Sequence, residues 1–287
     1  MAEAANERRG GLVRTMRVAL IQVAYGDDEP MDTRVERVAG LVREYGPGHD
    51  LVVLPELWAP GGFAYREWAD RAQPIDGPIG QAMSAAARDA GVTLHAGSIV
   101  ERREPASVGD DEHGLSNTSL VYRADGELIA AYRKIHRFGF GAGEPRLMDA
   151  GDEVVVVDLP LATSPGETVR VGLSTCYDLR FPELYRRQLD AGATVFLVPA
   201  AWPAPRVRHW TLLAHARAVE NQSLVIACNT AGTHARTEMG GHSQVVSAKG
   251  EALAMAGTGE EVLRVEVDLD EVAQWREQFP VLADRRL

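Results

Sequence analysis

Residues 169–198 read VRVGLSTCYDLRFPELYRRQLDAGATVFLV and contain two apolar runs separated by a helical segment. Val169–Ser174 and Thr194–Val198 are rich in apolar and β-branched residues over the length of a strand, so each run predicts a buried strand. Between them the chain is expected to be helical from Pro182 to Asp190. A strand, a helix and a second strand in this order predict the α/β class.

The alternation of strands and helices extends in both directions along the chain. The remaining predicted elements are strands at 16–23, 51–54, 93–100, 223–229, 245–246, 252–256 and 262–267, helices after a cap at Asp32-Thr33, at 79–90, at 208–221 and at 274–279, and a polar loop at 101–116. Two hairpins interrupt the alternation. One joins 118–122 to 128–132, and the other joins 154–159 to 169–174.

This pattern predicts one large mixed sheet, or two packed sheets, covered by helices. The sequence has no visible internal repeat, low-complexity tract or linker. We therefore expect residues 16–287 to form a single domain, preceded by a flexible leader of residues 1–15.

The chain has 287 residues and a formal net charge of −11, because 41 acidic side chains outnumber 30 basic ones. An acidic protein without a basic run repels nucleic acid and anionic membranes, so neither is expected as a partner. A locally placed Arg or Lys can still favour an anionic substrate. The apolar runs are strand-sized, which argues against a transmembrane helix.

The two cysteines, Cys176 and Cys228, have no metal-ligand spacing and are too few for a disulfide framework. A reducing cytoplasm fits this content best. The polar stretch at 1–15 lacks the apolar run of a signal peptide. We therefore expect a cytoplasmic protein.

A carboxylate, an ammonium group and a thiol each follow a predicted strand. Glu56 follows LVVLP, Lys134 follows LIAAYR, and Cys176 follows VRVGLST. If the three groups meet at strand ends, the carboxylate can take the thiol proton and the ammonium can stabilise the thiolate and the oxyanion. Their separation in sequence leaves another interpretation open, namely a buried thiol, a helix-start charge and a solvated basic cluster.

The segments LVVLPELW (51–58), AYRKIHRF (131–138) and GLSTCYDLRFPELYR (172–186) resemble the three signature blocks of the nitrilase superfamily of carbon–nitrogen hydrolases, in the same order and at similar separations. The likeness extends from residue 16 to beyond residue 265. It implies a four-layer α-β-β-α sandwich of two mixed sheets flanked by helices. It also implies homodimers formed through helices beside the active site, a Glu56-Lys134-Cys176 triad, and no metal or organic cofactor.

Further site residues follow from this resemblance and from the local sequence. Glu144 occupies the place of the family's second glutamate, which contacts the lysine and helps to position the substrate. Tyr177 can offer its backbone N–H to the oxyanion. Arg180 is a candidate partner for a substrate carboxylate, although the sequence favours a structural role for it. The implied mechanism passes through a thioester on Cys176, from which water releases the acid.

Residues 199–232, PAAWPAPRVRHWTLLAHARAVENQSLVIACNTAG, are most similar to the branch that contains omega-amidases and related small-amide hydrolases. Trp202 is a candidate wall of the acyl pocket. Arg206 is a candidate partner for the carboxylate of an omega-amide such as 2-oxoglutaramate. A core aromatic and a surface charge are equally open interpretations of these two residues. The glycine-rich stretch HRFGFGAGE (136–144) departs from many omega-amidases, and it adds Phe140 as a candidate substrate contact.

Other activities stay open. An N-carbamoyl amino acid amidohydrolase or a nitrilase would use the same triad, although nitrilases often carry tryptophan where this chain has Tyr177. A catalytically silent binding or scaffold protein belongs to another class, and the complete triad argues against it. The sequence contains no GxSxG, HExxH, GxGxxG or Walker motif. We therefore predict a cysteine-dependent hydrolase that cleaves the C–N bond of a small amide and releases ammonia.

Overall fold

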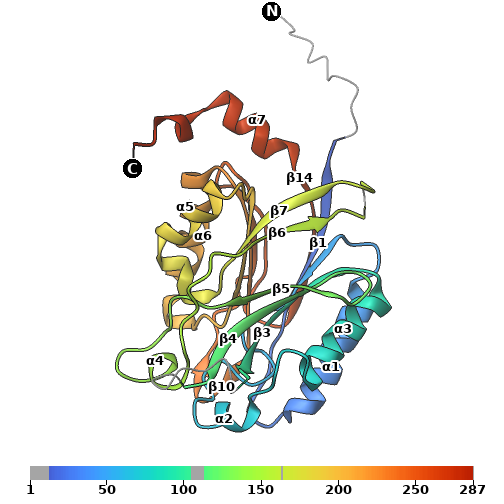
Figure 1. The fold of residues 1–287 in the computed structure, drawn as a ribbon, viewed down its shortest axis with the longest axis vertical. Helices are drawn as coiled ribbons and strands as arrows, with labels where there is room; N and C mark the ends of the chain where they lie inside the picture. Colours follow the sequence, from blue (N-terminus) through green and yellow to red (C-terminus); the bar gives the residue numbers. More distant parts are fainter. Residues whose placement is uncertain (1–12, 105–112, 163, 287) are drawn as a thin grey trace, which may run out of the picture.

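Two six-stranded sheets lie against each other at the centre of the molecule (Figure 1). The computed structural model describes residues 13–104, 113–162 and 164–286. The first sheet has the order β14-β1-β2-β3-β4-β5, with β1 (Thr15–Gln22), β2 (Leu51–Val53), β3 (Thr93–Arg102), β4 (Leu115–Tyr122), β5 (Leu128–Arg133) and β14 (Glu261–Asp268). The second has the order β13-β12-β9-β8-β7-β6, with β6 (Val156–Pro160), β7 (Thr168–Leu173), β8 (Val195–Ala200), β9 (Leu224–Asn229), β12 (Gln244–Val246) and β13 (Ala252–Met255).

A pair of helices covers the outer face of each sheet. α1 (Met31–Tyr45) and α3 (Pro78–Ala90) lie side by side over the first sheet, and α5 (Pro182–Asp190) and α6 (Val207–Asn221) lie over the second (Figure 1). The shorter elements are α2 (Trp68–Arg71), α4 (Glu144–Leu147), α7 (Asp270–Gln278), the hairpin of β10 (Thr233–His234) and β11 (Thr237–Glu238), and 3₁₀ turns at Cys176–Arg180, Ala204–Arg206 and Val281–Asp284. The predicted four-layer sandwich of two mixed sheets flanked by helices is confirmed.

The apolar pattern of the inner strands explains the layering. In β1, Ala19 and Ile21 belong to the core formed with α1 and α3, whereas Val18 and Leu20 belong to the core shared with the second sheet. Successive side chains of a strand point to opposite faces, so a strand buried on both faces must be apolar at consecutive positions. The uninterrupted apolar run of this strand therefore reflects two cores.

The two sheets repeat one topology, which the sequence does not reveal. In each, three strands run parallel in the middle, β1-β2-β3 and β7-β8-β9, and antiparallel strands complete both edges. Parallel neighbours need a crossover connection, which α1, α3, α5 and α6 provide. The carboxyl ends of β2, β7 and β8 therefore each open into a loop where functional side chains can gather.

A backbone contact joins the two sheets at these strand ends. The N–H of Glu56, three residues beyond β2, donates to the carbonyl of Ala200, the last residue of β8, at 3.3 Å. The N–H of Ala231 donates to the carbonyl of Val23 at 2.9 Å and ties the end of β9 to the end of β1. The segments that follow the parallel strands of both sheets are thus held against one another.

Several predicted boundaries differ from the structure. α1 begins at Met31, and neither Asp32 nor Thr33 caps it. β3 and β4 extend into the predicted polar loop, to Arg102 and back to Leu115, because the two strands pair over that stretch; residues 105–112 lie outside the described residues. α2 and α4 were not predicted, since four-residue helices leave no periodic pattern.

The first and last elements of the described chain also differ from the predicted boundaries. The first twelve residues of the predicted leader lie outside the described residues, and β1 already begins at Thr15, where it pairs with Asp268 of β14. α7 begins at Asp270, earlier than expected. The single domain over 16–287 stays a prediction. Within the described residues, no helix is long and apolar enough to cross a membrane.

Gly97 of β3 offers a test of how closely the strand approaches the Glu56 segment. Its φ is +69°, and an added Cβ would lie 1.9 Å from the carbonyl oxygen of Pro55. We expect Gly97→Ala to lower the free energy of unfolding by at least about 2 kcal/mol, through overlap and a strained backbone. Gly91→Ala is the matched control, because its φ is +62° and no atom lies within 4 Å of the added Cβ.

Gly91→Ala should lower the free energy of unfolding by about 1 kcal/mol, because it introduces only the backbone strain of a positive φ. Urea unfolding of both variants measures the difference. Equal losses in the two variants would show that the contact with Pro55 is readily relieved, contrary to the expectation.

Candidate active site

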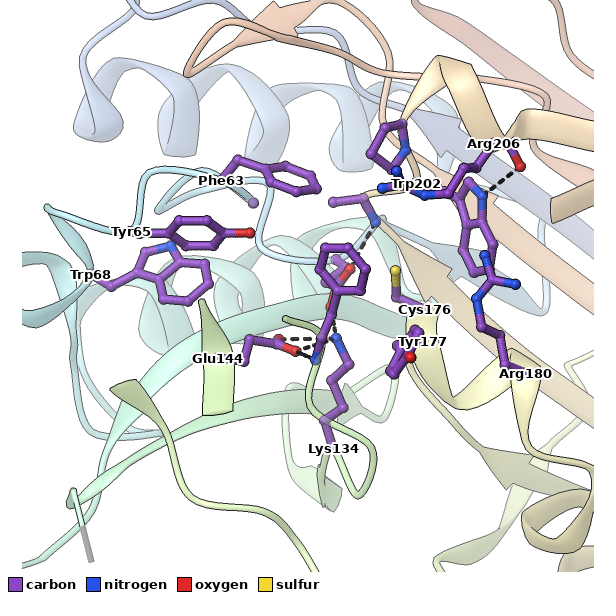
Figure 2. A pocket seen from close by; sticks show the side chains of 15 residues that line it. Phe63, Tyr65, Trp68, Lys134, Glu144, Cys176, Tyr177, Arg180, Trp202 and Arg206 are labelled. Atoms are coloured by element: carbon purple, nitrogen blue, oxygen red, sulfur yellow. Dashed lines mark hydrogen bonds and ion pairs between the residues drawn. The ribbon is translucent and has the colours of Figure 1, made fainter. Parts of the chain in front are cut away.

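A cavity opens at the seam between the two sheets (Figure 2). Its lining comes from segments that follow strands of both sheets and from the loop around α2. The lining residues are Glu56, Gly62, Phe63, Tyr65, Trp68, Lys134, Phe138, Glu144, Cys176, Tyr177, Arg180, Ala201, Trp202, Pro203 and Arg206. The cavity thus combines charged groups, a thiol and aromatic walls.

Three charged side chains form a buried cluster on one side of the cavity. The ammonium of Lys134 donates to Oε1 of Glu56 at 2.8 Å and lies 2.9 Å from both carboxylate oxygens of Glu144. The three residues are only 2–3% exposed. Buried charges persist when they are paired and hydrogen-bonded, and here two carboxylates flank one ammonium.

Both carboxylates are held by further donors. Oε2 of Glu56 accepts a hydrogen bond from the backbone N–H of Ala201 at 2.8 Å, across the seam. Glu144 accepts one from the backbone N–H of Phe138. The side-chain amide of Asn117 donates to Oε1 of both glutamates, at 2.8 Å each. The orientation of each carboxylate is therefore fixed by groups from separate elements.

Cys176 begins a 3₁₀ turn immediately after β7 and has a positive φ of 48°, an uncommon conformation for this residue type. A capping box holds the turn: Thr175 and Asp178 each accept the other's backbone N–H. Strained backbone is typical of functional sites, where surrounding structure must stabilise it. Figure 2 shows the sulfur atom facing the cavity, across from Lys134 and close to Trp202.

Asp178 connects this cysteine turn to the segment that carries the lysine. It is fully buried and accepts hydrogen bonds from the Tyr132 hydroxyl at 2.7 Å and from the backbone N–H of His136 at 2.9 Å. The His136 ring lies 2.7 Å from the same carboxylate and stacks on Phe181. Asp178 thus fixes the position of Cys176 relative to Lys134.

Burial and neighbouring charge set the protonation states of the site. Burial, together with the adjacent carboxylate of Glu56, raises the pKa of the Cys176 thiol well above its ordinary value, and Lys134 opposes the rise only in part. Burial alone would lower the pKa of Lys134, but the charges of Glu144 and Glu56 hold it well above the ordinary value. The resting site therefore pairs a neutral thiol with a permanent ammonium.

Two guanidinium groups lie at the other side of the cavity. Arg180 stacks over the Trp202 ring at 4.7 Å, and Arg206 lies 5.4 Å from the centre of the Phe138 ring. Burial, with a smaller contribution from Arg206, lowers the pKa of Arg180. Neither arginine forms an ion pair with a carboxylate of the described residues. This side of the cavity is therefore positively charged and aromatic.

The structure brings most of the predicted site residues together. Those that line the cavity are Glu56, Lys134, Glu144, Cys176, Tyr177, Arg180, Trp202 and Arg206. Phe140 is the exception: it is 85% exposed and is absent from the lining, where Phe138 takes the expected place. The ring of Phe140 points outward and packs against Phe138, and its role as a substrate contact stays a prediction.

Other residues of the site escaped the sequence analysis. Phe63, Tyr65 and Trp68 form an aromatic wall opposite Trp202 (Figure 2), but they lie in a stretch without periodicity. Asn117 fell between the predicted polar loop and the predicted strand. Its one visible signal is a polar side chain inside the strand LSNTSLVY, buried at 3% exposure.

No group of three or more His, Cys, Asp and Glu side chains in the described part of the chain is arranged to hold a metal ion. The predicted absence of a metal or an organic cofactor stays a prediction. The residues that line the cavity offer an acid–base pair, a thiol and cations, which suffice for acyl transfer to sulfur and to water.

Comparison with known proteins identifies the family. The carbon-nitrogen hydrolase family model matches residues 17–277, and the chain belongs to this family. A 2-oxoglutaramate amidase of Paenarthrobacter nicotinovorans is 45% identical over 269 residues, covering 94% of this chain and 89% of the relative. Omega-amidase NIT2 of Homo sapiens is 34% identical and covers 95% of each chain.

Solved structures agree with the fold. Nit3 of Saccharomyces cerevisiae, a member of branch 10 of the nitrilase superfamily, superimposes with a TM-score of 0.80 at 29% identity, covering 95% of this chain and 97% of Nit3. A CN-hydrolase superfamily protein of Xanthomonas campestris gives 0.82 at 27% identity, over 96% and 98% of the two chains. The predicted superfamily and its omega-amidase-like branch are confirmed, and the chain is an enzyme, a carbon–nitrogen hydrolase that acts on small amides.

The raised pKa of Cys176 predicts an unusual pH dependence of alkylation. Because only the thiolate reacts, we expect iodoacetamide to modify Cys176 slowly at pH 7, with a rate that still increases above pH 9. A free cysteine levels off near a pKa of about 8.5. Mass spectrometry of the Cys176 peptide measures the rate, and N-acetylcysteine serves as the reference thiol.

A rate that is already constant below pH 7 would mean that Lys134 outweighs burial and that the resting thiol is ionised. Cys228 should stay unmodified at all these pH values while the protein is folded, since it is completely buried and bonded to backbone carbonyls.

Proposed function

We propose that this enzyme hydrolyses the terminal amide of a small substrate that also carries a carboxylate, an omega-amide such as 2-oxoglutaramate, and releases ammonia. The observation that carries the proposal is the pair of guanidiniums, Arg180 and Arg206, without acidic partners in the described chain and facing the thiol across one cavity. In a protein of net charge −11, such a pair favours an anionic ligand group. The names of the relatives point to the same substrate class.

The two ends of such a substrate match the two ends of the cavity. The carboxylate would pair with Arg180 and Arg206, and Trp202 would contact the carbon chain between them. The amide would then lie at Cys176, with its carbonyl oxygen directed to the ammonium of Lys134 and the backbone N–H of Tyr177. The aromatic wall of Phe63, Tyr65 and Trp68 would exclude water on the opposite side.

In the first half-reaction, the sulfur of Cys176 attacks the amide carbon while Glu56 takes the thiol proton. Lys134 stabilises the negative charge on the carbonyl oxygen of the tetrahedral intermediate. Glu56 passes the proton to the nitrogen, the C–N bond breaks, and ammonia leaves. A thioester remains on Cys176.

In the second half-reaction, Glu56 takes a proton from water as the water oxygen attacks the thioester carbon. The C–S bond breaks, the proton returns to the sulfur, and the carboxylic acid departs. Glu144 makes no step of its own in this scheme; it pairs with Lys134 and helps to hold the ammonium toward the oxyanion.

We further propose a homodimer, or a higher homo-oligomer, that works in a reducing cytoplasm without nucleic acid or membrane partners. α6 leaves Leu212 and Val219 exposed at 67% and 52%, and large apolar side chains on one helix favour a contact with a second copy. Light scattering coupled to size exclusion should give at least twice the mass of one chain. A monomer at micromolar concentration would contradict the proposal.

An amide panel tests the activity. We expect ammonia release from 2-oxoglutaramate to exceed release from glutamine, an N-carbamoyl amino acid, a simple aliphatic amide and a nitrile. Cys176→Ala should lower kcat by at least about 10³-fold, because the other described residues that line the cavity offer no second thiol and no serine or threonine hydroxyl. Preference for the carbamoyl compound or the nitrile would agree with the triad but show that the proposed substrate class is wrong. Near-normal activity of Cys176→Ala would refute the mechanism.

Substitution of the two arginines tests binding of the substrate carboxylate separately from the reaction at Cys176. Arg206→Gln and Arg180→Gln should each raise KM for the anionic omega-amide by about tenfold or more, which corresponds to one lost charge-assisted hydrogen bond. Turnover of a neutral aliphatic amide should change little, so this amide is the internal control. Parallel losses on both amides would assign the arginines to folding instead of carboxylate binding.

A further inference from the structure

Asn117 completes a closed ring of hydrogen bonds inside the charged cluster. Its amide nitrogen lies 2.8 Å from Oε1 of Glu56 and 2.8 Å from Oε1 of Glu144. The ammonium of Lys134 bonds the same two oxygens, at 2.8 and 2.9 Å. Two donors and two acceptors thus alternate around the ring, with the glutamates at opposite corners.

The chemistry of the amide fixes its orientation. Both N–H protons of Asn117 are used, one for each carboxylate, and a flipped amide would turn its oxygen toward two anions. The remaining atom, Oδ1, is buried and has no hydrogen-bond partner within the described structure. Asn117 therefore donates to both glutamates while its own carbonyl oxygen stays buried without a hydrogen bond. That unpaired acceptor costs free energy of folding, which a residue that served only to fill space would not cost.

The backbone of Asn117 contributes to the same arrangement. Its carbonyl accepts the N–H of Lys134 at 2.9 Å, next to the pairing of β4 with β5. Asn117 thus bonds to Lys134 through its main chain and to both glutamates through its side chain. The residue does not line the cavity, so it acts on the substrate only through these three.

The ring also affects how Lys134 uses its protons. An ammonium has three N–H groups, and three carboxylate oxygens lie within 2.9 Å of it. If each oxygen took one proton, none would remain for the oxyanion. Because Asn117 supplies one donor to each glutamate, Lys134 can share one N–H between the two oxygens of Glu144 and direct another toward the cavity.

We propose that Asn117 is a positioning residue of the reaction, which holds the carboxylate of Glu56 in place beside Lys134 and leaves one N–H of Lys134 for the oxyanion. This inference rests on the roles proposed above for Glu56 and Lys134. It predicts that loss of the amide slows both the formation and the hydrolysis of the acyl-enzyme, while substrate binding at the arginines stays intact.

The test compares Asn117→Leu and Asn117→Asp with the wild type. Asn117→Leu removes both N–H donors and Asn117→Asp leaves at most one O–H donor, so both should lower kcat about 10²-fold with KM within about threefold. Burial raises the pKa of Glu144 and the hydrogen bond from Asn117 opposes that rise, so loss of the amide should raise this pKa further and move the acid limb of the kcat/KM profile to higher pH. A merely structural defect would reduce the amount of active protein and leave the profile in place.

Thr118→Val is the matched control. Thr118 is the next residue of β4, is equally buried, and donates a hydrogen bond to Glu101 at 2.6 Å, outside the cavity lining. The control should lower the melting temperature without moving kcat or the acid limb. Circular dichroism of every variant gives the fraction of folded protein, so kcat refers to intact enzyme.

p-Nitrophenyl acetate separates this inference from the substrate proposal. The ester acylates the cysteine without needing the arginines, and the burst of nitrophenolate and the later steady rate report acylation and deacylation. If the wild type turns over the ester but no omega-amide, the proposed substrate is wrong and Asn117 is still tested. Asn117 variants that keep both ester rates within threefold, with an unmoved acid limb, would overturn the inference.

Discussion

The organisation of this enzyme depends on keeping three charges dehydrated at the seam of two sheets. Glu56, Lys134 and Glu144 are almost completely buried, and transfer of each charge from water to a protein interior costs several kcal/mol unless partners replace the lost water. The pairing is possible because Glu56 follows β2, Lys134 follows β5, and Glu144 begins α4, which lies beside them. The cluster therefore forms only when the first sheet is complete, and the N–H of Ala201 completes it from the second.

The proposed nucleophile comes from the second sheet, so the proposed reaction needs both halves of the sandwich. Cys176 follows β7, and β7 and β8 are the counterparts of β1 and β2 in the repeated topology. Each half offers parallel strand ends, and the seam brings them together with a backbone hydrogen bond between Glu56 and Ala200. Asp178 then ties the cysteine turn to the lysine segment through Tyr132 and His136. A shift of one sheet against the other would separate the base from the thiol.

Much of this arrangement could be predicted from the sequence, because strands buried on both faces produce apolar runs and the reactive residues follow them directly. Glu56, Lys134 and Cys176 follow predicted strands, whereas Glu144 lies beyond β5, at the start of α4, and was predicted from the family resemblance alone. Asn117 and Tyr65 could not be found in the same way. Asn117 is a polar residue near the start of β4, where the adjoining polar sequence predicts a loop. Tyr65 lies in a segment without periodicity. The position of Phe140 outside the cavity lining could not be predicted for a complementary reason. A glycine-rich loop can direct either Phe138 or Phe140 inward, and composition does not decide which.

The distribution of charge around the cavity adds an argument about substrate orientation. Burial raises the pKa of Glu144 against the charge of Lys134, so the cluster of two carboxylates and one ammonium carries at most one net negative charge beside a neutral thiol, whereas Arg180 and Arg206 place two positive charges across the cavity. Opposite charges a few ångströms apart attract strongly where water is scarce, and like charges repel by the same amount. A substrate with one anionic end would therefore enter with that end toward the arginines. The glutamates would repel it in the reverse orientation, so the cluster proposed to activate the thiol would also direct the uncharged amide toward it.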